Sequence, residues 1–250
     1  MFTCPEIMDE LNRLLAEATK QHLHLRLIGG LAIKLHCKGA DHPALRRQYS
    51  DFDFVVPRIE GRRLEAFFYS MGYEPSREFN LLNGNRRQLY HDMGTGRRVD
   101  IFVGDFQMCH YLPLRGRMEI EAYTVPLAEL LLSKTQIVEL TRRDVLDVAA
   151  LLLDHPVGIG DHETINITRI VNLCTRRWGL FATTMDSLEK IRRYLGHENP
   201  GLNESELQLI LERAEEIQLA LKSARKPLRW RVRNTIGRRV PWYVKVDEIG

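Results

Sequence analysis

The pattern of apolar and polar positions changes several times along the first half of the chain. Between Glu6 and Lys20 apolar residues recur every three or four positions, which predicts an amphipathic helix. From His22 to Ile28 leucines alternate with polar residues, and this period of two predicts a strand that ends at Gly29. The pattern then predicts a helix over 31–37, a loop over 38–49, a strand over 51–56, a helix over 61–70, a hairpin of strands 87–91 and 98–103, and a last strand over 119–124.

From Pro126 onward the spacing is helical throughout. It predicts five helices over 127–140, 144–153, 164–178, 185–195 and 204–223, and Asn203 with Glu206 is expected to cap the last of them. The sequence therefore predicts an α+β fold, in which a mixed, mostly antiparallel sheet with flanking helices precedes an α-helical region. We expect a catalytic core over 1–125, a helical domain over 126–226 and a basic C-terminal tail over 227–250.

Composition places the chain among ordinary globular proteins, since 44% of its 250 residues are hydrophobic and 28% are charged. Its four cysteines are scattered without a C-x-x-C pair, which favours free thiols in a reducing compartment. The first residues lack the pattern of a signal peptide, and no apolar run is long enough to span a membrane. We therefore expect a cytoplasmic protein without membrane contact.

The net charge of +3 is small, but positive charge is concentrated near the C-terminus, where Lys222 to Pro241 contains eight basic residues and no acid. Such a segment suits RNA or another polyanion, and a solvated tail explains it equally well. Trp230, Trp242 and Tyr243 interleave with these charges. They could stack on bases or dock the tail on the body of the protein, and we favour docking.

Candidate chemistry gathers around the first two strands. Gly29 and Gly30 lie between a predicted strand and helix, where free backbone N–H groups favour an anion. Asp51 and Asp53 share one face of the next strand, although aspartate is disfavoured in strands, and a divalent cation would explain the pair. Asp100 lies on a later strand, and taken alone it is better explained as a solvent-facing acid.

Other nucleotide and metal motifs are absent from the sequence. The glycine pair is not followed by the Gly-Lys-Ser/Thr of a P-loop, and there is no G-x-G-x-x-G fingerprint of a dinucleotide site. His36-Cys37 and Cys109-His110 do not have the spacing of a structural zinc site. The two glycines and the strand acids are therefore the main candidates.

In order and type, Ile28-Gly29-Gly30, Asp51-Phe52-Asp53 and Val99-Asp100-Ile101 resemble the nucleotidyltransferase fold of the DNA polymerase beta superfamily. The resemblance implies that Gly29 and Gly30, with Ser50, hold a nucleoside triphosphate. It further implies that Asp51, Asp53 and Asp100 bind Mg²⁺ (or Mn²⁺), and that Asp100 helps to activate the acceptor hydroxyl. The gap between the glycines and Asp51 is longer than is usual in that family, and its extra residues include Arg46 and Arg47, which could reach phosphates.

Two stretches of the second half are similar to the abortive-infection toxin nucleotidyltransferases. These are Leu130 to Lys134 and Arg142 to Asp147. The resemblance implies that Lys134 contacts the triphosphate and that Asp144 or Asp147 lies at the nucleotide or positions the lysine. From the residues alone, Lys134 could equally be an exposed helix residue and Asp144 an acid favoured by the helix dipole.

The expected function is transfer of a nucleoside monophosphate from an NTP to the hydroxyl of an RNA such as tRNA, of a protein or of a small molecule. A toxin of a toxin–antitoxin pair is one specific form of this expectation. Two alternatives stay open: a non-catalytic nucleotide- or RNA-binding protein with the same fold, and a helical interaction protein whose first half is only structural.

Overall fold

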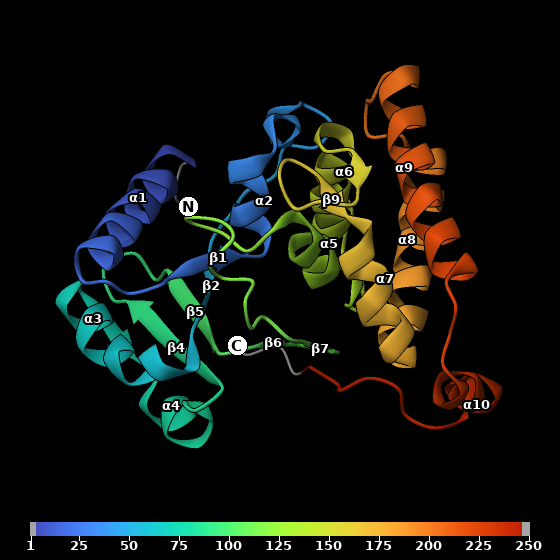
Figure 1. Ribbon diagram of the computed structural model, residues 1–250. Helices are drawn as coiled ribbons and strands as arrows, with labels where there is room; N and C mark the ends of the chain where they lie inside the picture. Colours follow the sequence, from blue (N-terminus) through green and yellow to red (C-terminus); the bar gives the residue numbers. More distant parts are fainter. Residues whose placement is uncertain (1–3, 247–250) are drawn as a thin grey trace. The chain divides into compact units, whose positions relative to one another are not determined.

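The computed structural model describes residues 4–246 of the chain, with side chains from Ile7 onward (Figure 1). These residues form two compact units. Within the described range, the first unit comprises 4–32, 48–106 and 113–125, and the second comprises 33–47, 107–112 and 126–246.

A five-stranded sheet is the centre of the first unit. Its strands β2 and β5 run parallel, and the other neighbouring pairs are antiparallel. This mixed, mostly antiparallel sheet confirms the α+β class. In spatial order the strands are β1 (Arg26–Ile28), β2 (Phe52–Val56), β5 (Arg98–Val103), β4 (Arg87–Asp92) and β3 (Tyr73–Pro75).

The two faces of this sheet differ in chemistry. Phe52 and Phe54 are fully buried on one face, where the ring of Phe68 stacks on Tyr90 at 4.7 Å between centroids. Asp53 and Asp100 alternate with these apolar residues, so their side chains are on the opposite face. The helical segments of this unit are α1 (Cys4–Lys20), η2 (Arg58–Arg63), α3 (Leu64–Ser70) and α4 (Arg77–Asn83), while α2 (Gly30–His36) begins directly after Gly29.

The second unit is mainly helical, as predicted. Helices α7, α8 and α9 pack against one another (Figure 1). The capping box expected at the start of α9 is present, since Asn203 accepts from the backbone N–H of Glu206 and the Glu206 side chain accepts in return. The helical segments are η1 (Lys38–Asp41), α5 (Leu127–Thr135), α6 (Arg142–Asp154), α7 (Ile167–Arg176), α8 (Trp178–Glu198), α9 (Glu204–Ser223), α10 (Leu228–Ile236) and η3 (Gly237–Arg239).

The structure also contains two short strand pairs outside the main sheet. Strand β6 (Phe106–Gln107) pairs with β7 (Tyr111–Leu112), and β8 (Val157–Gly158) pairs with β9 (Ile165–Asn166). No helix of the described chain is both long and apolar enough to cross a membrane. Cys37, Cys109 and Cys174 are free and buried, as expected, and the side chain of Cys4 lies outside the described residues.

Two strand predictions were wrong in whole or in part. Residues 119–124 form turns and bends, and only Thr124 makes a β-bridge, to Leu27. Their alternation does not mark a buried face, because Ile120 and Tyr123 are 41% and 54% exposed. The strand predicted over 22–28 begins only at Arg26, since the backbone of Leu23 bonds back to Ala18 at the end of α1.

The structure contains two helices that hydrophobic spacing did not predict. Helix α4 has no buried side chain, so it lacks the apolar stripe that marks a helix in sequence. Helix α10 lies within the predicted tail and buries only Trp230. Elsewhere boundaries moved: the helix predicted to reach residue 140 ends at Thr135, and 185–195 is only part of α8.

Aromatic packing holds α10 on the second unit, which confirms the docking interpretation for Trp230. Its indole Nε1 donates to the carbonyl of Cys174 at 3.1 Å, and its ring packs in a cluster with Trp178, Ala182 and Phe181. Lys226 lies over the Trp230 ring at 5.7 Å, and burial lowers its pKa. Part of the positive charge of the Lys222–Pro241 segment thus serves attachment.

Replacing Trp230 by Ala should release α10. The loss of a buried aromatic side chain costs about 3–5 kcal/mol, and here that loss falls on the attachment of one helix. Trypsin should then cleave the arginine-rich segment faster than in the wild type. Val232→Ala is the control, because Val232 lies on the same helix and is 56% exposed; equal cleavage rates in the two variants would show that Trp230 does not hold the helix.

Candidate active site

The turn after β1 requires glycine at position 29. Gly29 has a φ of +78°, and a Cβ placed on it would lie 2.5 Å from Oδ2 of Asp53. The strand register explains this closeness, since Ile28 pairs with Asp53 across β1 and β2. The backbone of Gly29 therefore lies directly against the Asp53 carboxylate, and Gly30 follows as the first residue of α2.

The three predicted acids lie on one face of the sheet. Asp53 and Asp100 are register partners on the parallel strands β2 and β5, so their backbones are about 4.8 Å apart. Asp51 precedes β2 by one residue and is two positions before Asp53, and its carboxylate accepts from the Ser50 hydroxyl at 3.1 Å. The structure thus brings Gly29, Ser50 and the three acids together in the first unit.

Asp100 is not the solvent-facing acid that its sequence context alone suggested. It is only 3% exposed, and Arg87 of β4 binds it with both Nε, at 2.8 Å, and Nη2. The guanidinium carbon of Arg87 also lies 5.0 Å from the ring centroid of Phe102. Burial lowers the pKa of Arg87, but hydrogen bonds and charge from Asp100 outweigh it and raise this pKa overall.

Asp51 is the more accessible acid, with 38% of its side chain exposed. Its carboxylate lies 3.7 Å from Nη2 of Arg98, which is the neighbour of Val99 on β5. Arg87 thus holds Asp100 tightly, and Arg98 holds Asp51 loosely. Within residues 4–246 no group of three or more His, Cys, Asp or Glu side chains has the arrangement of a metal site.

Two carboxylates nevertheless fit Mg²⁺, because this ion is usually bound through one or two carboxylates with substrate phosphates and water filling the other positions. Asp51 and Asp53 have the oxygen chemistry and partial exposure that this mode needs. Asp100 is committed to Arg87 and would join them only if that ion pair opened.

The predicted residues of the second unit form a separate ionic group. Lys134 of α5 lies 3.0 Å from Asp144 and 2.8 Å from Asp147, both on α6, and Arg47 binds Asp147 at 2.6 Å. Lys134 is not an exposed helix residue, since only 15% of its side chain is accessible. Burial lowers the pKa of Lys134, but the charges of Asp147 and Asp144 reverse the effect and raise it.

Asp144 also stabilises the start of α6. It closes a capping box with Thr141, in which each side chain accepts from the other residue's backbone. Burial raises the pKa of Asp144, yet Lys134 and Thr141 lower it overall. Both acids that were expected at the nucleotide or beside the lysine pair with Lys134. Arg46, the other arginine of the loop, is exposed.

Arg87 and Arg98 are the site residues that sequence reasoning missed. Both lie on the predicted hairpin, and its register contains the signal: Leu89 pairs with Asp100, so Arg87 follows diagonally on the same face. An arginine two positions from the residue opposite a buried acid is a natural partner for that acid.

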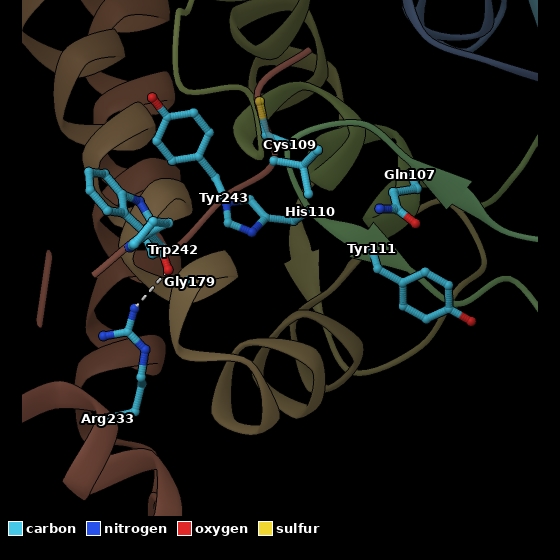
Figure 2. A pocket seen from close by; sticks show the side chains of 10 residues that line it. Gln107, Cys109, His110, Tyr111, Gly179, Arg233, Trp242 and Tyr243 are labelled. Carbon is cyan, nitrogen blue, oxygen red and sulfur yellow. Dashed lines mark hydrogen bonds between the residues drawn. The ribbon is translucent and has the colours of Figure 1, made fainter. Parts of the chain in front are cut away.

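A cavity of about 390 Å³ lies in the second unit beside the C-terminal segment (Figure 2). His110 lines it, and burial lowers the pKa of this histidine to about 4, so it is neutral at physiological pH. Its Nε2 lies 2.8 Å from the Thr183 hydroxyl. Arg233 also lines the cavity, and its Nη2 donates a hydrogen bond at 3.3 Å to the carbonyl of Pro241, the residue before Trp242 (Figure 2).

Comparisons with known proteins identify neither a family nor a function for this chain. No family model matches the sequence, and no curated protein matches it significantly. The structure is similar to the crystal structure of JHP933 from Helicobacter pylori, with a TM-score of 0.41 and 13% identity over 94% of this chain and 99% of that one. A likeness at this level carries no functional argument.

Gly29→Ala should destabilise the first unit by about 1–3 kcal/mol, because it adds both a strained φ and a collision with Asp53. Gly72→Ala separates the two causes, since Gly72 has a φ of +87° with no atom within 4 Å of its would-be Cβ. Chemical denaturation should show the larger loss for Gly29. Equal losses of unfolding free energy in the two variants would mean that the Asp53 side chain moves away from the added Cβ at no cost.

Arg87→Met should cost about 3–5 kcal/mol of unfolding free energy, because it leaves the buried Asp100 carboxylate unpaired. The double variant with Asp100→Leu should recover most of this loss. Arg86→Met, at the exposed neighbouring position, is the control for the change in net charge. Urea unfolding of the wild type and the three variants measures these costs. If Arg87→Met costs no more than Arg86→Met, the stability of the buried Asp100 does not depend on this ion pair.

Proposed function

We propose that the protein is a metal-dependent nucleotidyltransferase that moves a nucleoside monophosphate from an NTP to an acceptor hydroxyl. One observation carries the proposal: the Gly29 turn lies directly against Asp53, with Asp51 and Asp100 on the same face of the sheet. A bare backbone turn suits phosphate oxygens, and the adjacent carboxylates suit the cation that accompanies them.

Each residue then has a definite task. The backbone of Gly29 and Gly30 holds phosphate oxygens, and Ser50 orients the Asp51 carboxylate through its hydroxyl. Asp51 and Asp53 would hold Mg²⁺, which when bound neutralises phosphate charge and favours in-line displacement. Arg87 holds the Asp100 carboxylate in place through its hydrogen bonds. Positioning and charge neutralisation would supply most of the rate enhancement.

RNA is the acceptor that the tail favours. Lys226, Arg233 and Arg238 are used in attachment, through the rings of Trp230, Trp178 and Trp242 and an ion pair from Arg238 to Asp186. Other cations of the Lys222–Pro241 segment form no side-chain hydrogen bond or ion pair with any described residue; these include Arg225, Arg229 and Arg239. Unpaired arginines on one segment suit a phosphate backbone, and a toxin acting on RNA would be one form of this function.

The decisive test incubates the protein with Mg²⁺ and each labelled NTP, with and without RNA. Asp53→Asn should lower transfer by about 100-fold or more, because it weakens charge stabilisation at the phosphates. Asp9→Asn is the matched control, since Asp9 is exposed on α1. EDTA should abolish transfer, and absence of both binding and transfer with every NTP would refute the proposal.

The Arg87–Asp100 pair favours a second candidate, a nucleotide-binding protein that does not catalyse transfer. Asp100 is already paired with the positive charge of Arg87 and does not need a metal cation, so the protein could bind an NTP in the absence of Mg²⁺. This candidate predicts NTP binding without turnover, unchanged by EDTA and by Asp53→Asn. Toxicity of the expressed protein that Asp51→Asn removes would instead favour the enzyme.

A further inference from the structure

The first unit contains a cationic pocket that the proposed transfer reaction does not use. It has a volume of about 750 Å³ and lies among η2, the start of α3, α4 and the adjoining ends of β4 and β5. Gln88 and Val103 line it, and both alternate along their strands with the residues of the acid face. The pocket is therefore on the opposite side of the sheet from Asp53 and Asp100.

Buried polar contacts hold the walls of this pocket in place. The Gln88 amide donates to the carbonyl of Gly61 on η2 at 3.0 Å and to that of Gly84 after α4 at 2.9 Å, while its oxygen accepts from Tyr90. Asn80 of α4 both donates to and accepts from the backbone of Leu89. Helix α4 has no buried side chain, so these bonds fix its position.

Two glycines allow close backbone approaches at the walls. A Cβ on Gly61 would lie 2.8 Å from Val103, and a Cβ on Gly84 would lie 2.3 Å from the carbonyl oxygen of Asn80. A larger residue at position 61 would push η2 away from β5, and one at position 84 would distort the last turn of α4. Contacts within the first unit thus shape the pocket, and its volume is in the range of about 300–1,000 Å³ that is typical of small-molecule sites.

The charge of the pocket is strongly positive. Arg58, Arg62 and Arg77 line it together with a single acid, Glu65. Arg58 donates to the carbonyl of Asn85 at 3.3 Å. Among the described residues, Arg62 and Arg77 have no hydrogen-bond or ion-pair partner, so both are available to an external anion.

An apolar wall adjoins these arginines. Leu81 of α4 is 86% exposed although it lines the pocket, and Pro75 and Val103 lie with it. A large apolar side chain beside free guanidinium groups suits a ligand with an anionic end and an apolar body. Arginine binds phosphate oxygens with paired N–H groups, and a doubly charged anion matches the excess of cations.

We propose that this pocket binds a small phosphate monoester with an apolar ring or chain, through Arg62 and Arg77 at the phosphate and Leu81 against the apolar part. This site is separate from the NTP site proposed above, and it does not require that the protein catalyses transfer.

Calorimetric titration of the full chain with phenyl phosphate tests the proposal, with inorganic phosphate and phenol as the two halves of the probe. Phenyl phosphate should bind with a Kd on the order of millimolar or below and more tightly than either half. The double variant Arg62→Gln/Arg77→Gln should weaken binding at least tenfold. Arg86→Gln, which removes a charge from an exposed residue outside the pocket, should change it less than twofold.

Leu81→Asn should weaken the binding of phenyl phosphate but leave the binding of inorganic phosphate unchanged. Circular dichroism of each variant checks that it is folded. Asp53→Asn should not alter phenyl phosphate binding, even if it abolishes NTP binding, so the two proposals fail independently. Absence of saturable binding, equal weakening by Arg86→Gln, or loss of binding in Asp53→Asn would each overturn the assignment.

Discussion

The approach of the Gly29 backbone to the Asp53 carboxylate is the constraint on which the acid face depends. It sets how closely the end of β1 lies beside β2, and it is possible only because position 29 has no Cβ and adopts a positive φ. Parallel pairing of β2 with β5 then brings Asp100 beside Asp53. A turn that suits phosphate and a row of acids are therefore consequences of one packing arrangement.

Concentrated negative charge on a sheet face must be balanced, and the protein balances it with arginine. Arg87 satisfies the buried Asp100 through two hydrogen bonds, and the ring of Phe102 supports its guanidinium group. Asp51 stays partly exposed with a weaker partner. The acid face thus runs from a buried, fixed carboxylate at Asp100 to a partly exposed one at Asp51.

The second unit treats charge in the same way. Lys134 and Arg47 are held by Asp144 and Asp147 in a buried group that also joins α5 to α6. Near the C-terminus aromatic rings act together with an acid: Trp178 and Trp230 contact Arg233 and Lys226, and Asp186 pairs with Arg238. In both places, basic residues that have a partner hold parts of the unit together.

Periodicity alone determined much of the secondary structure of this protein, because an element that buries one face has apolar residues at regular intervals in its sequence. The strand over 51–56, the hairpin around residues 93–96 and the long capped helix over 204–223 were all predictable for that reason. The glycine pair and the Asp-x-Asp also identified which strands carry the acids. Helices α4 and α10 were not predictable, since one buries no side chain and the other only Trp230.

Tertiary structure alone decided which charges are free. The sequence contains Arg62, Arg77 and Arg87 as similar basic residues, yet Arg87 is committed to Asp100 and the other two face a pocket. Likewise, the sequence does not show that Asp100 is buried while Asp51 is partly exposed, because both alternate with apolar neighbours. Which group each charged side chain contacts depends on strand register and on contacts between elements distant in sequence. Local sequence patterns do not contain this information.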